Sequence, residues 1–361
     1  MGLKHNDQSV RRVNAPSISV LVPIYNAERF LKKALDSLRS QTFCNFEAIC
    51  INDGSTDTSR AIIQEYLDKD ARFKVIDKPN SGYGASMNRG ISEARGTYIA
   101  FLEPDDFMES NALELLYSTA EENKADVVKA NYWFYWSEPE EKNQIIQVIK
   151  PEMANRILDP QKEPEIYLAL PSVWSALYRR SYLQNNNIAF LETPGASFQD
   201  LGFSFKIWAY THAVYLLEEP ILHYRQDNEA SSVNNPHKAF CVCVELEEIE
   251  RTLEKLPNKE KLAPYVYRLK YDNYMWNYQR LSVDLRKQFL KRMVEDLKAG
   301  KEEGNFVPEI FGSWQSKNLV FLLKDPKEFY KKFPINPTRM QKAWYYFKLG
   351  GPKVLLDAFN R

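Results

Sequence analysis

The sequence predicts an α/β fold, with a mainly parallel central sheet, flanking helices and a C-terminal helical region. Two observations support this. Short apolar, β-rich runs alternate with helical patterns between residues 18 and 102, and only helical patterns follow from about His237. Because each strand is followed by a helix before the next strand, successive strands are expected to run parallel.

The predicted strands cover residues 18–22, 46–51, 73–76 and 97–102. After the first strand, apolar side chains recur at helical spacing between residues 30 and 38, and similar patterns follow the second and third strands. Right-handed crossovers place the loop after every strand at the same edge of the sheet, where ligands bind in open α/β folds. The polar residues of these loops are therefore expected to meet.

A cluster of carboxylates, Glu103, Asp105 and Asp106, directly follows the fourth strand. Mg²⁺ and Mn²⁺ prefer oxygen ligands and commonly take one or two protein carboxylates, with phosphate and water completing the shell. Alone, such a cluster is more typical of a solvated turn or a helix cap. Tyr25 and Asp53, in the loops after the first two strands, share the predicted edge and favour a nucleotide site.

Four motifs, in this order, resemble those of family 2 glycosyltransferases. They are residues 20–26 (VLVPIYN), 51–59 (INDGSTDTS), 80–84 with 87–90 (NSGYG, MNRG) and 96–106 (GTYIAFLEPDD). The resemblance spans about residues 16–130 and continues more weakly to about 235. It implies a GT-A fold, a nucleotide-diphosphate sugar donor, a divalent metal (Mn²⁺ or Mg²⁺) and inversion at the anomeric carbon.

The family pattern implies a set of donor-binding positions: Pro23, Tyr25, Asn26, Glu28, Asp53, Asn80, Gly82, Gly84, Asn88, Glu103, Asp105 and Arg225. Tyr25 would stack on the base and Asp53 would accept a hydrogen bond from it. Other interpretations remain open: Tyr25 could be a packed aromatic, Asp53 could cap its own turn, and Glu28 could complement a helix dipole. The two glycines would allow close backbone approach to the donor.

One departure concerns the charge that faces the diphosphate. Many family members have Ala-Arg-Asn where this chain has Ser86, Met87 and Asn88. Arg89 is the nearest cation, but a shift of two positions on a helix points to another face. The diphosphate contacts are therefore left open by the sequence.

A second departure is Glu103 in place of the usual first aspartate of the metal motif. Asp105 matches the last aspartate and is the first choice as metal ligand, with Asp106 as its neighbour. His223 is a further candidate, since a histidine near this position is a ligand in some relatives. Glu103 could instead reach the ribose or an ordered water.

Residues 195–205 resemble the family segment that carries the catalytic base. Asp200 falls on the aspartate that would accept the proton of the acceptor hydroxyl, and Gln199 replaces the adjacent glutamate. Asp200 could instead only cap the helix that follows. Trp174 and Gln199 are expected on the acceptor side, although Trp174 could equally be a core residue.

The composition argues against several other classes. Lys plus Arg equals Asp plus Glu, 48 each, so no global charge indicates a nucleic-acid partner. The four cysteines have neither zinc spacing nor disulfide density. No signal peptide and no apolar run of about 18 residues is visible, so a cytoplasmic location is expected.

The expected organisation has an N-terminal extension (1–15), a catalytic domain (16–235) and a C-terminal helical region (236–361). Within the catalytic domain, residues 16–130 would bind the nucleotide sugar and 131–235 would supply the acceptor side and base. The helical region could pack on the catalytic domain, form a homodimer or shape the acceptor site. The basic, aromatic tail from Lys331 could dock on its own domain or lie on an anionic membrane surface.

The sequence thus predicts an inverting, metal-dependent glycosyltransferase that moves a sugar, most simply from a UDP-sugar, to a hydroxyl of a surface glycan or lipid-linked oligosaccharide. Two alternatives belong to other classes. A sugar nucleotidyltransferase would need a basic phosphate loop after the first strand, where this chain has Tyr25, Asn26 and Ala27. A degenerate binding module is favoured only by the substitutions at Met87, Glu103 and Gln199.

Overall fold

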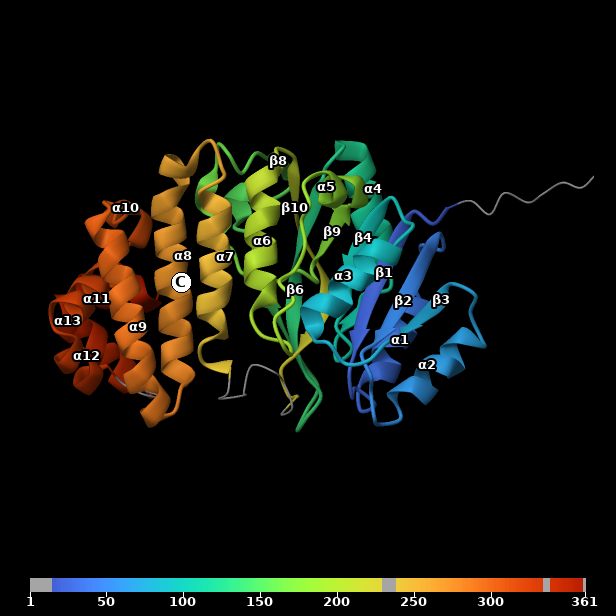
Figure 1. Cartoon of the computed structure of the whole chain (residues 1–361), viewed down its shortest axis with the longest axis horizontal. Helices are drawn as coiled ribbons and strands as arrows, with labels where there is room; N and C mark the ends of the chain where they lie inside the picture. Colours follow the sequence, from blue (N-terminus) through green and yellow to red (C-terminus); the bar gives the residue numbers. More distant parts are fainter. Residues whose placement is uncertain (1–14, 229–237, 334–337, 360–361) are drawn as a thin grey trace, which may run out of the picture.

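The computed structural model describes residues 15–228, 238–333 and 338–359. A ten-stranded sheet forms one end of the molecule, and the C-terminal helices form the other (Figure 1). Eight strands are hydrogen-bonded in the order β3-β2-β1-β4-β9-β6-β10-β5, while β7 pairs with β6 and β8 pairs with β10. The sheet is the scaffold that positions the loops described below.

The N-terminal half of the sheet is parallel, as predicted. Its strands are β1 (Ile18–Ile24), β2 (Phe46–Asn52), β3 (Phe73–Asp77) and β4 (Tyr98–Phe101). Every residue of β1, β2 and β4 is buried, which explains why apolar residues predominate on both faces of these strands. The intervening helices are α1 (Leu31–Arg39), α2 (Ser59–Leu67) and α3 (Tyr83–Glu93).

The second half of the sheet mixes strand directions. It consists of β5 (Phe107–Met108), β6 (Val127–Trp136), β7 (Lys142–Ile146), β8 (Arg156–Leu158), β9 (Ala176–Arg179) and β10 (Val214–Arg225). β9 lies antiparallel between β4 and β6, whereas β10 is parallel to β6. The α-helices and 3₁₀ helices of this half are α4 (Ala112–Asn123), η1 (Pro151–Met153), η2 (Pro164–Leu168), α5 (Arg180–Asn185) and α6 (Gln199–Tyr210).

The C-terminal part is helical, as predicted. Its helices are α7 (Cys241–Leu253), α8 (Lys259–Arg280), α9 (Val283–Glu302), α10 (Pro308–Phe311), α11 (Ser313–Lys324), α12 (Pro326–Lys332) and α13 (Arg339–Phe359). α7 packs on α6 and α8 packs on α7 and η2, so this part is joined to the sheet half by direct contact. The proposed boundary at residues 235 and 236, and all but the last residue of the proposed extension 1–15, lie outside the described residues.

The last helix, α13, docks on α11 and bends at Gly350 and Gly351, where Gly351 has a φ of 74°. Tyr346 and Val354 are buried in this contact, while several apolar side chains of α13 stay exposed. Docking of the tail on its own domain, one of the two interpretations from the sequence, therefore occurs. Within the described ranges, no helix combines the length and the apolarity that crossing a membrane requires.

Candidate active site

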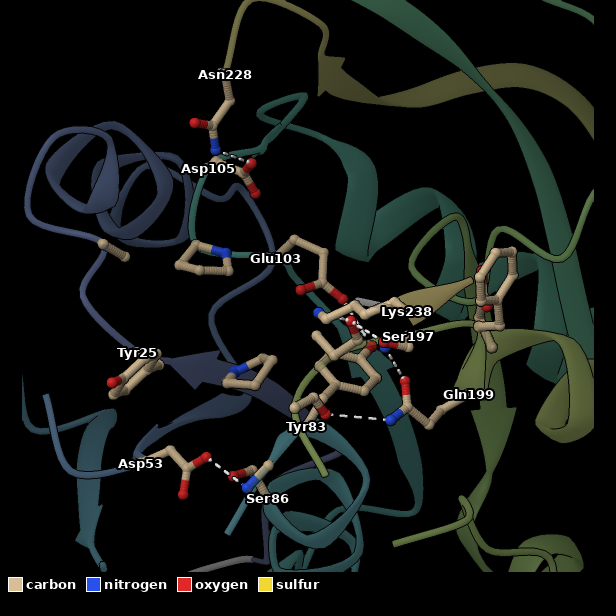
Figure 2. Close-up of a pocket in the computed structure, with 18 of the residues that line it drawn as sticks. Tyr25, Asp53, Tyr83, Ser86, Glu103, Asp105, Ser197, Gln199, Asn228 and Lys238 are labelled. Carbon is tan, nitrogen blue, oxygen red and sulfur yellow. Dashed lines mark hydrogen bonds between the residues drawn. The ribbon is translucent and has the colours of Figure 1, made fainter. Parts of the chain in front are cut away.

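A cleft with a volume of about 1160 Å³ opens at the carboxyl ends of the parallel strands (Figure 2). Its walls come from the loops after β1, β2, β3 and β4, the start of α6 and the end of α8. Eleven of the predicted site residues line it: Pro23, Tyr25, Asn26, Asp53, Asn80, Gly82, Glu103, Asp105, Trp174, Gln199 and Asp200. The loops that the sequence predicted at one edge of the sheet therefore meet.

Tyr25 is the most open aromatic side chain on the wall formed by the first loops, with 52% of its surface exposed. Asp53 lies on the same wall and is buried. Its two carboxylate oxygens accept hydrogen bonds from the backbone N–H groups of Ser81 (2.9 Å) and Gly82 (3.0 Å), and it pairs with Lys78. Asp53 thus fixes the loop after β3 rather than capping its own turn, and it still lines the cleft.

The two glycines of the third loop approach protein backbone. Gly82 has a φ of 92°, and a Cβ there would lie 2.9 Å from the backbone nitrogen of Gly195. A Cβ on Gly84 would lie only 2.0 Å from the carbonyl oxygen of Leu191. Gly84 does not line the cleft, so the expectation that it approaches the donor is corrected: it allows α3 to pack on the chain around residue 191.

Glu28 and Asn88 also lie outside the cleft and serve the scaffold. Glu28 Oε2 accepts hydrogen bonds from the backbone N–H of Thr58 (2.9 Å) and its hydroxyl (2.5 Å), which ties the first loop to α2. Asn88 Nδ2 donates to the carbonyl oxygen of Phe190 (3.0 Å), and Asn88 Oδ1 accepts from its N–H (2.9 Å). Neither side chain is placed to contact a donor in the cleft.

Two members of the acidic cluster, Glu103 and Asp105, face the cleft (Figure 2). Tyr83 Oη donates to Glu103 Oε1 at 2.7 Å. Burial raises the pKa of Glu103 to about 8, and the charges of Asp105 and Asp200 act in the same direction. Asp105 Oδ2 accepts a hydrogen bond from Asn228 Nδ2 at 2.8 Å. Burial therefore favours the protonated form of Glu103.

Asp106 and Arg225 brace the acidic loop from behind. Asp106 is 1% exposed, and its Oδ1 accepts from the backbone N–H of Arg225 at 2.8 Å. Arg225 Nε donates to the carbonyl oxygen of Asp105 at 3.0 Å, and its guanidinium lies 4.2 Å from the ring centroid of Phe30. Neither side chain lines the cleft. In this arrangement both side chains support the acidic loop, and the metal ligand at Asp106 and the donor contact at Arg225 stay predictions.

His223 is likewise outside the cleft. One ring nitrogen lies 2.8 Å from Asn143 Oδ1, the other lies 2.8 Å from Glu109 Oε1, and the ring stacks on Phe107. With both nitrogens engaged, His223 is not available as a metal ligand in this arrangement. In the described parts of the chain, no three His, Cys, Asp or Glu side chains form a metal-binding group. Asp105 beside Glu103 still fits an ion that takes its other ligands from phosphate and water.

Asp200 lies in the first turn of α6 and faces the cleft. The turn is set by Phe198, which adopts a φ of 62° immediately before the helix. Burial raises the pKa of Asp200 to about 6, while backbone N–H groups at the start of α6 and the charge of the buried Lys129 oppose this rise. Asp200 is thus largely ionised at neutral pH and close enough to its pKa to accept a proton.

Gln199 and Trp174 border the base. Gln199 is 2% exposed, and its Nε2 donates to Thr193 Oγ1 (2.8 Å) and to the carbonyl oxygen of Gly195 (3.1 Å). Its amide therefore shapes the loop before α6, and an acceptor contact would have to compete with these bonds. Trp174 lines the cleft yet is only 9% exposed, packed against Tyr224 with ring centroids 4.8 Å apart. Trp174 is thus packed in the core and also borders the cleft, while its contact with an acceptor stays a prediction.

The contribution of the C-terminal helical region to the cleft was not predicted from the sequence. Trp276, Asn277 and Arg280, from the end of α8, line the cleft together with Lys238. No motif marks these positions, although Trp276 and Arg280 have the spacing of neighbours on one helix face. Met87, where many family members have Arg, is fully buried, and Arg89 pairs with Glu93 outside the cleft. Arg89 therefore does not supply the missing charge.

A mixed, mainly parallel sheet with flanking helices and a helical C-terminal region is the architecture predicted as GT-A. The family is identified by sequence comparison. Residues 19–186 match the family described as Glycosyl transferase family 2, and this part of the chain is a domain of that family. The family and fold predicted from the motifs are confirmed.

Two Bacillus subtilis proteins named as glycosyltransferases are similar in sequence. EpsH is 35% identical over 219 residues, which cover 59% of this chain and 62% of EpsH. The uncharacterized EpsJ is 34% identical over 230 residues, which cover 62% of this chain and 64% of EpsJ. The chain thus matches less than two thirds of the length of either relative.

Solved structures share the fold at low sequence identity. A crystal structure of Staphylococcus aureus TarS in complex with UDP superimposes with a TM-score of 0.66 at 18% identity, covering 87% of this chain and 89% of that chain. The mannosyltransferase PcManGT from Pyrobaculum calidifontis, in complex with GDP-Man and Mn²⁺, gives a TM-score of 0.53 at 12% identity, covering 96% and 86%. These likenesses support the GT-A architecture.

Proposed function

We propose that this chain is an inverting, metal-dependent glycosyltransferase that transfers a sugar from a UDP-sugar to a hydroxyl of a surface glycan or lipid-linked saccharide. The observation that carries the proposal is the placement of Tyr25, Asp105 and Asp200 on one cleft. These three side chains could respectively stack on a base, hold a cation at a diphosphate and accept a proton. The family match and the glycosyltransferase names of EpsH and EpsJ support the same reaction class.

In the proposed reaction, Asp200 accepts the proton of the acceptor hydroxyl while the hydroxyl oxygen bonds to the anomeric carbon. The bond from that carbon to the donor phosphate breaks on the opposite face, and the nucleoside diphosphate leaves with the bonding electrons. A single displacement of this kind inverts the configuration. The transition state resembles an oxocarbenium ion, so the position of Asp200 relative to the sugar contributes as much as its basicity.

The metal would be held by Asp105, with Glu103 as its neighbour. A Mn²⁺ or Mg²⁺ ion bound there would neutralise the charge that develops on the departing diphosphate. The protein prepares this position by anchoring the loop: Asn228 bonds the Asp105 carboxylate, and Arg225 bonds the Asp105 carbonyl. Glu103 is tied to Tyr83 and burial favours its protonated form, so Asp105 is expected to supply the negative charge.

A peripheral membrane contact of α13 belongs to the same proposal. Trp344 and Phe347 are exposed, their rings stack on each other, and Lys348 lies 4.9 Å from the Trp344 ring centroid. Aromatic side chains next to lysines suit an anionic lipid interface. Such a contact would bring the cleft close to a lipid-linked acceptor.

A thermal-shift screen of UDP, GDP and their sugars with and without Mn²⁺ tests the donor assignment. A ligand that binds the native state raises its melting temperature, so UDP with Mn²⁺ should give the largest shift among the nucleotides. An equal shift with GDP, or the same shift in EDTA, would contradict the UDP or the metal assignment respectively. Tyr25→Ala should reduce the shift, whereas Tyr215→Ala, outside the cleft, should leave the shift caused by UDP intact.

A further inference from the structure

The end of α8 forms a wall of the cleft next to the proposed base. Trp276 is 46% exposed on this wall, and its ring packs edge-on against Phe198, with centroids 5.7 Å apart. Phe198 precedes Asp200 by two residues. An acceptor sugar whose hydroxyl reaches Asp200 would therefore have the indole of Trp276 within reach of its next ring. Exposed indoles are good platforms for the apolar face of a sugar.

Arg280 adds a positive charge to the same wall. Its guanidinium carbon lies 3.9 Å from the ring centroid of Trp276, which fixes the cation over the indole. Along the described ranges, no carboxylate forms an ion pair with Arg280. The residue as a whole is exposed and lines the cleft, where its donors can meet a ligand anion. Arginine binds planar or tetrahedral oxyanions through two parallel hydrogen bonds.

The neighbours of Arg280 place it on the acceptor side. Arg280 lines the cleft together with Tyr224. Tyr224 in turn packs on Trp174, the aromatic residue beside the base. Tyr25 and Asp53, the predicted contacts of the nucleotide base, come from the loops after β1 and β2. α8 is thus associated with the part of the cleft where the acceptor would enter.

We propose that Trp276 and Arg280 form an acceptor subsite for a sugar that carries an anionic group, either a uronic acid carboxylate or a phosphate ester. This inference rests on the proposed function, since it assigns the acceptor of the same cleft. The indole of Trp276 takes the sugar ring, and the guanidinium of Arg280 takes the oxyanion. A neutral sugar would use only the indole and leave the cation without a counter-charge.

The test is a set of calorimetric titrations of the whole protein with methyl β-D-glucuronide, glucose 6-phosphate and methyl β-D-glucoside. The charged probes should bind about tenfold more tightly than the neutral glucoside, which corresponds to one charge-assisted hydrogen-bonded contact. A preference between the two charged probes identifies carboxylate or phosphate as the natural group. Equal affinities for charged and neutral probes would overturn the inference.

Substitutions test whether Trp276 and Arg280 cause the binding of the probes and the preference for charge. Arg280→Gln should remove the advantage of the charged probes, Arg280→Lys should retain part of it, and Trp276→Ala should weaken all three probes. Lys287→Gln is the matched control, since Lys287 is exposed on α9 away from the cleft and its loss changes the charge equally. An Arg280→Gln protein that still prefers charged probes would reject the subsite.

A UDP titration separates this inference from the proposed function. If wild-type protein binds UDP while the probes show no preference for charge, only the acceptor subsite is wrong. If UDP itself does not bind, the donor assignment fails and the subsite falls with it. If Arg280→Gln weakens UDP and leaves the charged probes unaffected, Arg280 contacts the donor diphosphate and the inference is overturned.

Discussion

At the residue scale, the protonation of Asp200, the proposed base, is expected to set the pH dependence of transfer. Burial raises the pKa of this carboxyl to about 6, and only the ionised form can accept the acceptor proton. The rate of transfer under subsaturating acceptor should therefore rise with pH and level off about one unit above this pKa. The measurement is kcat/KM for the acceptor between about pH 5 and pH 8. A rate that falls or stays constant across this range would contradict Asp200 as the base.

Asp105 supplies the second prediction at this scale. Asp105→Asn should weaken UDP binding in the presence of Mn²⁺ by about tenfold or more, because a carboxylate ligand of the cation is lost. His223→Asn is the matched control, since both ring nitrogens of His223 are bonded outside the cleft. Calorimetric titration with UDP, with and without Mn²⁺, measures the UDP affinity of both variants. A larger loss in His223→Asn than in Asp105→Asn would restore His223 as a ligand.

At the element scale, α7 carries a buried carboxyl behind the base. Glu245 is 1% exposed, and neither of its carboxyl oxygens has a hydrogen-bond partner among the described residues. It packs against Gly202 on α6, where a Cβ would lie 2.4 Å from Glu245 Oε2. Burial raises the pKa of Glu245 to about 8, and the charge of Asp200 adds to the rise. The α6–α7 contact therefore holds a proton at neutral pH.

This proton makes the stability of the fold pH-dependent. The folded pKa of Glu245 is raised above its ordinary value of 4.5, so between about pH 5 and pH 8 the folded state binds more protons than the unfolded state. Its contribution to the free energy of unfolding falls as pH rises through that window. Glu245→Gln, which is neutral at every pH, should be more stable than wild type by about 1 to 3 kcal/mol at about pH 8.

Chemical denaturation at about pH 5 and pH 8 measures this effect. The gain in Glu245→Gln should be small at the lower pH and largest at the higher one. Glu248→Gln is the control on the same helix, because it loses the 2.7 Å ion pair with Lys206 and should lower the stability near neutral pH. A Glu245→Gln protein that is less stable than wild type at about pH 8 would contradict the prediction.

Some features of the sheet could be predicted from the sequence and others could not. β1, β2 and β4 are buried on both faces, so their mainly apolar runs predicted them to within two residues. The antiparallel insertion of β9 between β4 and β6 was not predicted, because the pairing of Tyr98 with Arg179 depends on contacts far apart in the chain. Local spacing carries no information on such a register.

Of the candidate site, too, one part was predicted from the sequence and another was not. Loops that directly follow parallel strands were predicted to meet because topology alone brings them to one edge. The side chains that turn away, such as Asp106 and Asn88, have the same local sequence signals as those that face the cleft. Only their partners, the backbone of Arg225 and of Phe190, distinguish them. The wall formed by α8 was not predicted, because its position beside the cleft depends on helix packing, which local sequence spacing does not specify.

At the scale of the whole molecule, the exposed face of α13 predicts how the protein meets a membrane. Trp344→Ala combined with Phe347→Ala should reduce binding to phosphatidylglycerol vesicles at least about fivefold, since both buried apolar area and aromatic anchors are lost. Val320→Ala, exposed on α11, is the control. Cosedimentation with vesicles at low salt measures the fraction of each protein that is bound. Wild-type protein that binds neutral and anionic vesicles equally, or neither, would rule out this contact.

Tyr25, Asp105, Asp200 and the end of α8 line one cleft, so the proposed transfer would depend on both halves of the molecule. The most direct test compares wild type with Asp200→Asn in UDP affinity and in UDP release from UDP-sugars with acceptor and Mn²⁺. We expect near-equal UDP affinity and a loss of turnover of about 10²- to 10⁴-fold in Asp200→Asn. Wild-type turnover in Asp200→Asn, or no turnover of any UDP-sugar by the wild-type protein, would contradict this expectation.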